Sequence, residues 1–164
     1  MTTDDRRKAD GEAPKYMAVQ GAAVLVGAIF LVVGVLGFIP GITSDYDTLQ
    51  WAGHHSGARL FGVFAVSGLH NVVHVAFGVA GLVMARTYAG ARAYLLVAGL
   101  IYLAMWVYGL LIDHGSGANF VPVNSADDWL HFGLGVAMIL LGVTLAARRD
   151  PTTAIDTRTP PATR

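Results

Sequence analysis

The sequence predicts an all-α protein, a bundle of four transmembrane helices, and three observations lead to this fold class. Of the 164 residues, 54% are hydrophobic and only 13% are charged, a composition that differs from that of soluble globular proteins. The apolar residues are concentrated in four long segments. Most of the 20 glycines lie inside these segments, as small residues do where membrane helices pack closely.

The first predicted helix covers residues 16–39, in which Gln20 is the only strongly polar side chain. A helix needs roughly 20 apolar residues to cross the hydrocarbon core. The segment is longer than the ~7–15-residue apolar core of a signal peptide, and no small-residue cleavage site follows it. The charged residues 1–15 and the Pro/Thr-rich residues 148–164 lack apolar periodicity. We expect both to be disordered, which leaves residues 16–147 as the membrane domain.

The second predicted helix covers residues 60–85 and follows a polar loop, residues 40–58, in which Trp51 is expected at the membrane surface. With 26 residues, this helix is longer than a straight crossing requires. We therefore expect it to tilt or to project from the bilayer. A short turn at residues 86–92 leads to the next segment.

The third predicted helix, residues 93–112, is rich in aromatic residues and is followed by an acidic loop, residues 113–128, without a basic residue. The fourth covers residues 129–147. Ser125 precedes Asp128 by three residues just before this apolar run. This spacing has the form of a helix-start capping box, with Asp in place of Glu.

The basic residues predict the orientation of the helices. By the positive-inside rule, the side with most Lys and Arg faces the cytoplasm. One residue, Arg59, falls on the opposite side. We therefore expect a multi-pass protein of the plasma membrane with both termini in the cytoplasm. The basic residues on the predicted cytoplasmic side are Arg6, Arg7, Lys8, Lys15, Arg86, Arg92, Arg148, Arg149, Arg158 and Arg164.

The second predicted helix carries four polar residues within its apolar run: Ser67, His70, Asn71 and His74. At helical spacing they fall on one side of the helix, together with Gly78. A polar group in hydrocarbon is costly unless it has a partner. We therefore expect this polar stripe to face other helices, and it forms the first part of a candidate site.

The beginnings of the second and fourth predicted helices can be aligned without gaps. Residues 70–78, HNVVHVAFG, are then placed on residues 127–135, DDWLHFGLG. The alignment suggests a parallel duplication of a helix pair, a route by which membrane bundles arise. It also adds to the candidate site three polar residues around the beginning of the fourth predicted helix: Asp127, Asp128 and His131.

Two motifs resemble those of a known family. These are the H-N-x-x-H-x-x-x-G of residues 70–78 and the P-V-N-S-A-D-D-W-L-H of residues 122–131. Together with the four-helix layout they resemble the bacterial membrane family catalogued as domain of unknown function 4383, over roughly residues 16–147. The resemblance implies a four-helix integral membrane domain and no established activity. Asp128 departs from the family pattern, in which Asn is more usual, so a role that needs a neutral amide is in doubt there.

Three interpretations of the candidate site remain open. We favour the first, a structural or partner-subunit membrane module in which the polar side chains form hydrogen bonds between helices. The second is a protein that binds a metal or a redox cofactor. The third is a small proton or solute conduit, because ionisable groups in membranes often line pathways. The residues of the candidate site are Ser67, His70, Asn71, His74, Asp127, Asp128 and His131.

The metal interpretation depends on histidine spacing. His70 and His74, four residues apart on a helix, can point at one ion, and the candidate third and fourth ligands are His131, Asp127 or Asp128. Haem is the alternative cofactor, but its two axial ligands must face each other across the ring, which this pair cannot do alone.

The expected partners are the lipid bilayer and, through the glycine-containing helices, a second copy or another membrane protein. The sequence contains no cysteine, phosphate-binding loop, nucleophile triad or basic face for nucleic acid. We therefore expect no nucleic-acid partner and favour a protein that is not an enzyme.

Overall fold

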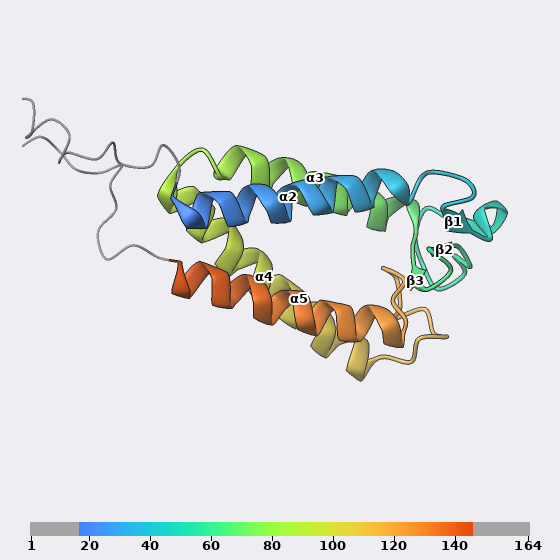
Figure 1. Ribbon diagram of the computed structural model, residues 1–164. Helices are drawn as coiled ribbons and strands as arrows, with labels where there is room; N and C mark the ends of the chain where they lie inside the picture. Colours follow the sequence, from blue (N-terminus) through green and yellow to red (C-terminus); the bar gives the residue numbers. More distant parts are fainter. Residues whose placement is uncertain (1–16, 146–164) are drawn as a thin grey trace, which may run out of the picture.

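The computed structural model describes residues 17–145 and is mostly helical. Its four helices form two antiparallel pairs, and Figure 1 shows α2 beside α3 and α4 beside α5. The prediction of a helical protein with four helices is confirmed. The predicted disordered segments, residues 1–15 and 148–164, lie outside the described residues. The helices are α2 (Ala18–Leu36), α3 (Gly68–Met84), α4 (Tyr88–Leu111) and α5 (Ser125–Thr144).

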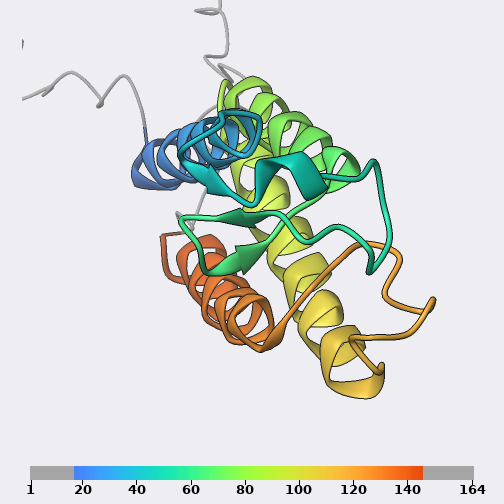
Figure 2. The same ribbon diagram turned by 90° about the vertical axis from the view of Figure 1, so that its right-hand side faces the viewer.

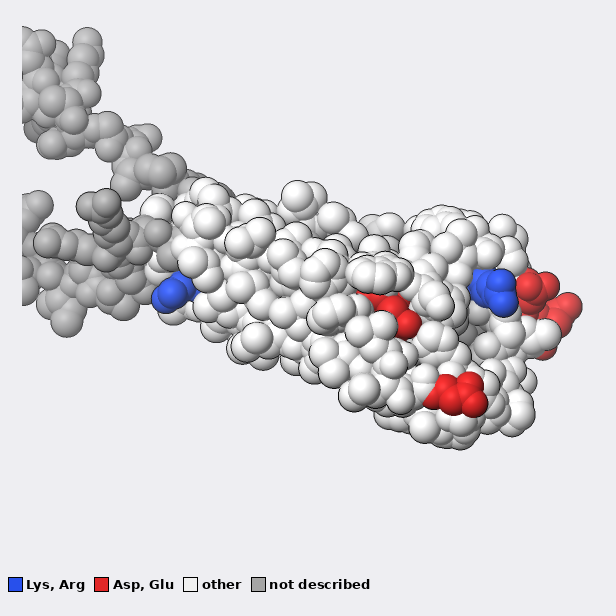
Figure 3. Space-filling model, turned by 90° about the horizontal axis from the view of Figure 1, so that it is seen from below, with Lys and Arg blue, Asp and Glu red and all other residues white. Residues whose placement is uncertain are grey.

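Three of these helices, α2, α4 and α5, are long and apolar enough to cross a membrane. The fourth, α3, has 17 residues. The start of α2, the end of α5 and the short α3–α4 turn lie at one end of the molecule, and the loops lie at the other (Figure 1). On the face shown in Figure 3, basic groups lie toward both ends, and the acidic groups lie between the middle of the face and the loop end. This distribution is typical of a membrane protein.

The prediction of one helix over residues 60–85 is wrong at its beginning. Residues before Gly68 form two strands of a small antiparallel sheet. Phe61 and Gly62 have left-handed φ angles of 54° and 72°, which make the tight turn between these strands. Ser67 then caps α3 by accepting a hydrogen bond from the His70 backbone N–H at 3.1 Å. The strands are β1 (Thr43–Ser44), β2 (Arg59–Leu60) and β3 (Phe64–Ala65), in the order β1-β2-β3.

The sheet lies across the loop end of the helices, as Figure 2 shows. Leu60 and Val66 are buried beneath it, in a small cluster that also contacts Val33 of α2. This segment is therefore a cover for the space between the helix pairs. One continuous helix over the 26 predicted residues would contain no strands to cover this space.

The first residues of α5 also differ from the prediction. The N-cap is Asn124, one residue before the predicted Ser125. The Asn124 side-chain oxygen accepts hydrogen bonds from the N–H groups of Ala126 and Asp127, at 2.8 and 3.2 Å. In turn, Asp127 Oδ2 accepts a hydrogen bond from the Asn124 backbone N–H at 2.9 Å. The capping box is therefore present, but it is shifted by one residue.

Replacing Asn124 with alanine is expected to destabilise the protein by about 1 kcal/mol, because the cap of α5 is lost. Ser125→Ala is the matched control. Ser125 is already inside the helix, so its replacement is expected to be nearly neutral. Thermal unfolding in detergent measures both. A larger loss for Ser125→Ala would show that the predicted cap is the correct one.

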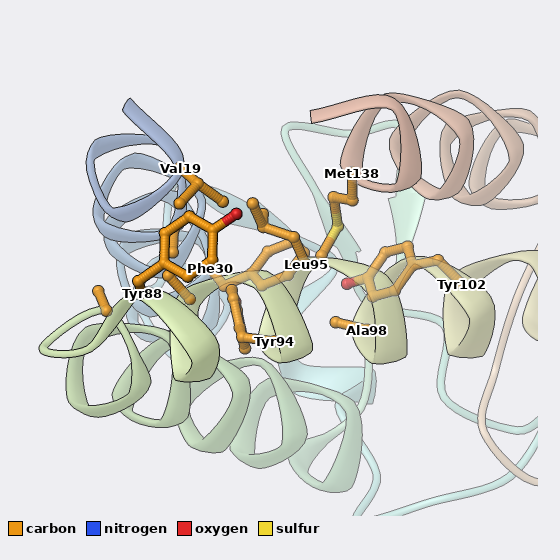
Figure 4. Packing of buried hydrophobic residues seen from close by; sticks show 11 residues of the cluster. Val19, Phe30, Tyr88, Tyr94, Leu95, Ala98, Tyr102 and Met138 are labelled. Atoms are coloured by element: carbon orange, nitrogen blue, oxygen red, sulfur yellow. The ribbon is translucent and has the colours of Figure 1, made fainter. Parts of the chain in front are cut away.

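The α3–α4 turn is shorter than predicted. Thr87 accepts a hydrogen bond from the Gly90 N–H at 3.1 Å and caps α4, which begins at Tyr88. Toward this end, apolar side chains of α2, α4 and α5 fill the space between the pairs (Figure 4). Phe30, Leu95 and Met138 are almost fully buried there.

Candidate functional site

Glycines allow the two helices of each pair to pack closely. A methyl group at Gly27 of α2 would lie 3.0 Å from the Gly78 carbonyl oxygen of α3. A methyl group at Gly99 of α4 would lie 3.0 Å from the Gly135 carbonyl oxygen of α5. The helix backbones are therefore in direct contact in both pairs, at matching places.

Two of the predicted site residues lie within the helix pairs. The Asn71 side chain of α3 packs against Gly37, just after α2, so closely that a methyl group there would overlap it. The Asp128 carboxylate of α5 packs in the same way against Gly109 of α4. The His114 Nε2 atom also lies 3.2 Å from Asp128 Oδ2. These two residues therefore contribute to packing at the loop end of each pair.

Asp127 connects α5 to the sheet. Its Oδ2 accepts a hydrogen bond from the Ala65 N–H of β3 at 3.0 Å, in addition to the bond from Asn124. The Asn124 side chain in turn donates to the Val63 carbonyl at 2.9 Å. These two side chains hold the β2–β3 turn over the loop end of α5. Sequence analysis placed Asp127 in the site but missed Asn124.

His74 is hydrogen-bonded on both ring nitrogens. Its Nδ1 lies 3.1 Å from the His70 carbonyl oxygen, which can only accept, so Nδ1 carries the proton. Its Nε2 lies 3.0 Å from the Tyr102 hydroxyl, which donates to it. His74 is therefore a neutral imidazole linking α3 to α4. Sequence analysis noted only that this helix is rich in aromatic residues and did not single out Tyr102, although its hydroxyl is one of the few polar groups of the helix.

Aromatic rings meet at the centre of the bundle. Phe30 of α2 and Tyr102 of α4 are stacked, with ring centroids 5.2 Å apart. Phe30 meets the edge of His74 at 5.7 Å, and Tyr102 meets the edge of His131 at 5.1 Å. The rings of His70 and His74 are parallel, 4.5 Å apart. The structure therefore brings the three predicted histidines of α3 and α5 to one place.

A cavity of about 170 Å³ lies between the helix pairs, beneath the sheet. We call it the chamber. A second cavity of about 120 Å³ lies on the α3–α4 side, and His70, His74, Tyr102 and His131 form part of both walls. The chamber is lined by Ile29, Phe30, Val33, Leu60, Phe61, Phe64, Val66, His70, Asn71, His74, Tyr102, Asp127, Leu130, His131 and Leu134.

Several polar atoms around the chamber are buried without a partner. Among residues 17–145, His70 Nδ1, His131 Nδ1 and Asn71 Nδ2 have no hydrogen bond. His70 and His131 are only 7% and 5% exposed. Buried polar groups are nearly always paired, so an unpaired one is a place where a bound molecule can form a hydrogen bond. Because of these unpaired polar atoms, we interpret the chamber as a candidate binding site and not as a gap in the packing.

Within the part of the chain that the structure describes, no three His, Cys, Asp or Glu side chains are grouped so that they could hold a metal ion. His70, His74 and His131 line the same chamber, but His74 uses both nitrogens for protein contacts. Metal ligation by these residues therefore stays a prediction. Ser67 is a helix cap and does not line the chamber.

Replacing His74 with leucine is expected to destabilise the protein by about 1–3 kcal/mol, because the buried Tyr102 hydroxyl loses its acceptor. Adding Tyr102→Phe removes the orphaned hydroxyl, so the double variant should be more stable than the sum of the single changes implies. Thermal unfolding of the four proteins gives the coupling energy. Simple additivity would contradict the His74–Tyr102 hydrogen bond.

These features define the class of the protein, a small helical protein whose helices are suited to a membrane and enclose a histidine-lined chamber. The chain belongs to the family described as Domain of unknown function (DUF4383), whose model matches residues 20–144. This confirms the family predicted from the motifs of residues 70–78 and 122–131. No curated protein and no solved structure matches the chain significantly.

Proposed function

We propose that this chain is a multi-pass protein of the bacterial plasma membrane, with four membrane-spanning helices and both termini in the cytoplasm. The basic residues near the helix ends support this orientation. Arg86 and Arg92 lie by the α3–α4 turn, at the end where α2 begins and α5 ends (Figure 1). With 17 residues, α3 lies at the short end of the range for membrane helices.

We further propose that the membrane domain is a parallel duplication of a helix pair. The alignment of residues 70–78 with 127–135 is supported by contacts that recur in both halves. The contacts of Gly27 with Gly78 and of Gly37 with Asn71 recur as Gly99 with Gly135 and Gly109 with Asp128. The edge contact of Phe30 with His74 recurs as Tyr102 with His131. The pseudo-two-fold axis that relates the halves then passes between the stacked rings of Phe30 and Tyr102.

The proposed function is the binding of a small molecule in the chamber. One observation carries this proposal: His70 and His131 line the chamber, and each has a buried ring nitrogen without a partner. The chamber lies at the interface of the two proposed repeats, where membrane proteins built from repeats often bind their substrates. Pockets of this kind, mostly apolar with a few convergent polar groups, are the usual form of ligand sites.

In this proposal, the other residues of the candidate site have structural roles. Asn71 and Asp128 pack within the helix pairs, and Asp127 holds the sheet. The conduit interpretation is less well supported. Between the chamber and the end with the termini, apolar side chains such as Leu95 and Met138 fill the space (Figure 4).

Native mass spectrometry of the full chain, purified from its membranes in mild detergent, tests the proposal. Ile29 lines the chamber and Leu25 lies one turn away on α2, facing outward. We expect the wild type and Leu25→Trp to carry an added mass that organic solvent removes, and Ile29→Trp to lack it. Bare protein in every sample would contradict the proposal and favour a purely structural module.

A further inference from the structure

The size of the chamber limits what it can hold. An apolar cavity of about 150 Å³ is known to take up a single benzene ring. At about 170 Å³, the chamber has room for one six-membered ring with small substituents. A drug-sized ligand needs about 300 Å³ or more. The following inference rests on the proposed function and concerns the chemical class of the ligand.

The walls of the chamber favour a ring that arrives from the bilayer. Phe30, Phe64 and Tyr102 provide aromatic surfaces around it. One side is formed by Ile29 of α2 and Leu130 of α5, which are 47% and 40% exposed on the outside of the bundle. These two helices pack mainly against other partners, α3 and α4. An apolar tail attached to the ring can therefore leave between α2 and α5 into lipid.

The charge around the chamber favours a neutral ligand. Within residues 17–145, no Lys or Arg lines it, and Asp127 is its only carboxylate. An anion would have no positive partner there and would lie near that carboxylate. Asp127 Oδ2 already accepts hydrogen bonds from the Ala65 and Asn124 N–H groups. The buried carboxylate is thus engaged with the protein, and a cation is not required to compensate it.

The unpaired imidazole nitrogens favour a hydroxyl group. A ring nitrogen of a neutral histidine either donates or accepts, depending on the tautomer. A hydroxyl group does both, so it can pair with His70 Nδ1 or His131 Nδ1 in either tautomer. A purely hydrocarbon ring would leave these buried nitrogens unpaired, at the cost of their desolvation.

We infer that the chamber binds the ring of a phenolic lipid, a single six-membered ring that carries a hydroxyl group and an apolar tail. The hydroxyl pairs with the imidazoles of His70 and His131, the ring lies against Phe30 and Tyr102, and the tail passes between α2 and α5. Membrane quinols and other phenolic lipids share this chemistry.

Two synthetic probes test this inference with the full chain in detergent: 4-hexylphenol and hexylbenzene, which differ by one hydroxyl group. We expect 4-hexylphenol to bind at least tenfold more tightly, because hexylbenzene leaves the imidazole nitrogens unpaired. Nonspecific partition would favour hexylbenzene, which is the more apolar probe. Ile29→Trp should abolish binding of 4-hexylphenol, whereas Leu25→Trp should retain it.

A second variant tests the role of the imidazole. His131→Leu is expected to remove the preference for the phenol while hexylbenzene still binds. Circular dichroism and thermal unfolding establish that the variant is folded. Should it fail to fold, His131→Gln, which keeps a polar side chain, is expected to reduce the preference at least threefold. An unchanged preference in a folded His131 variant overturns the inference.

The remaining outcomes separate this inference from the proposed function. Equal binding of the two probes, or binding of neither, overturns the phenolic ligand. The proposed function still stands in that case if the purified wild type carries a mass that Ile29→Trp lacks. Analysis of the solvent extract then distinguishes the sources: the mass of a quinol or of another phenolic lipid supports the inference, and a non-aromatic molecule overturns it.

Discussion

Gly78→Ala is expected to destabilise the protein strongly, by about 1–3 kcal/mol or more, which is typical of overpacking in a tight core. An alanine methyl group at this position would lie 2.5 Å from the Leu31 backbone nitrogen and 2.7 Å from its Cα atom. Backbone atoms of α2 cannot rotate away as a side chain can. Helices α2 and α3 must therefore separate, and the walls of the chamber move with them.

Thermal unfolding in detergent, followed by circular dichroism, measures this effect. Gly133→Ala is the matched control, because a methyl group on this α5 residue meets no other atom within 4 Å. Alanine is the better helix former by up to about 1 kcal/mol, so this control is expected to be neutral or stabilising. Equal melting temperatures for the two variants would mean that α2 and α3 are not in backbone contact at Gly78.

Asp127→Ala is expected to have the second large effect, because it releases the sheet from α5. The N–H groups of Ala65 and Asn124 both donate to Asp127 Oδ2. Each buried N–H left without a partner costs about 1–3 kcal/mol. Beyond the loss of stability, we expect faster hydrogen exchange in residues 60–66, which form the cover of the chamber.

Hydrogen exchange with mass spectrometry, together with thermal unfolding, checks this prediction. Asp47→Ala is the control, since Asp47 is an exposed loop carboxylate and is expected to change neither measurement. Asp127→Asn should lie between the two, because its amide oxygen can still accept. Unchanged exchange over residues 60–66 in folded Asp127→Ala would contradict the role of Asp127 as the connection between α5 and the sheet.

The helices could be predicted because the hydropathy and length of an apolar segment determine whether it forms a membrane helix. The segments around α2, α4 and α5 were found to within a few residues by their apolar runs. Residues 60–67 were assigned wrongly because their apolar composition suits a buried strand as well as a membrane helix. The left-handed turn at Phe61 and Gly62 decides between the two, and φ angles cannot be read from composition.

The candidate site was predictable in part, because histidines in an apolar run need partners. His70, His74 and His131 do line one chamber. The spacing along the chain could not predict that the side chains of Asn71 and Asp128 would pack against glycines. It could not predict that Tyr102 would hold His74 either, since contacts between helices depend on how the two pairs are rotated relative to each other.

The unequal lengths of α3 and α4 have a consequence for the surrounding lipid. At 1.5 Å per residue, the 17 residues of α3 extend about 26 Å and the 24 residues of α4 about 36 Å. Leu110 and Leu111, at the end of α4, belong to the part of α4 that exceeds the length of α3, and they are 56% and 80% exposed. If α3 and α4 both span the membrane, as proposed above, a bilayer with an apolar thickness of about 30 Å must thin beside α3, or the whole bundle must tilt toward it.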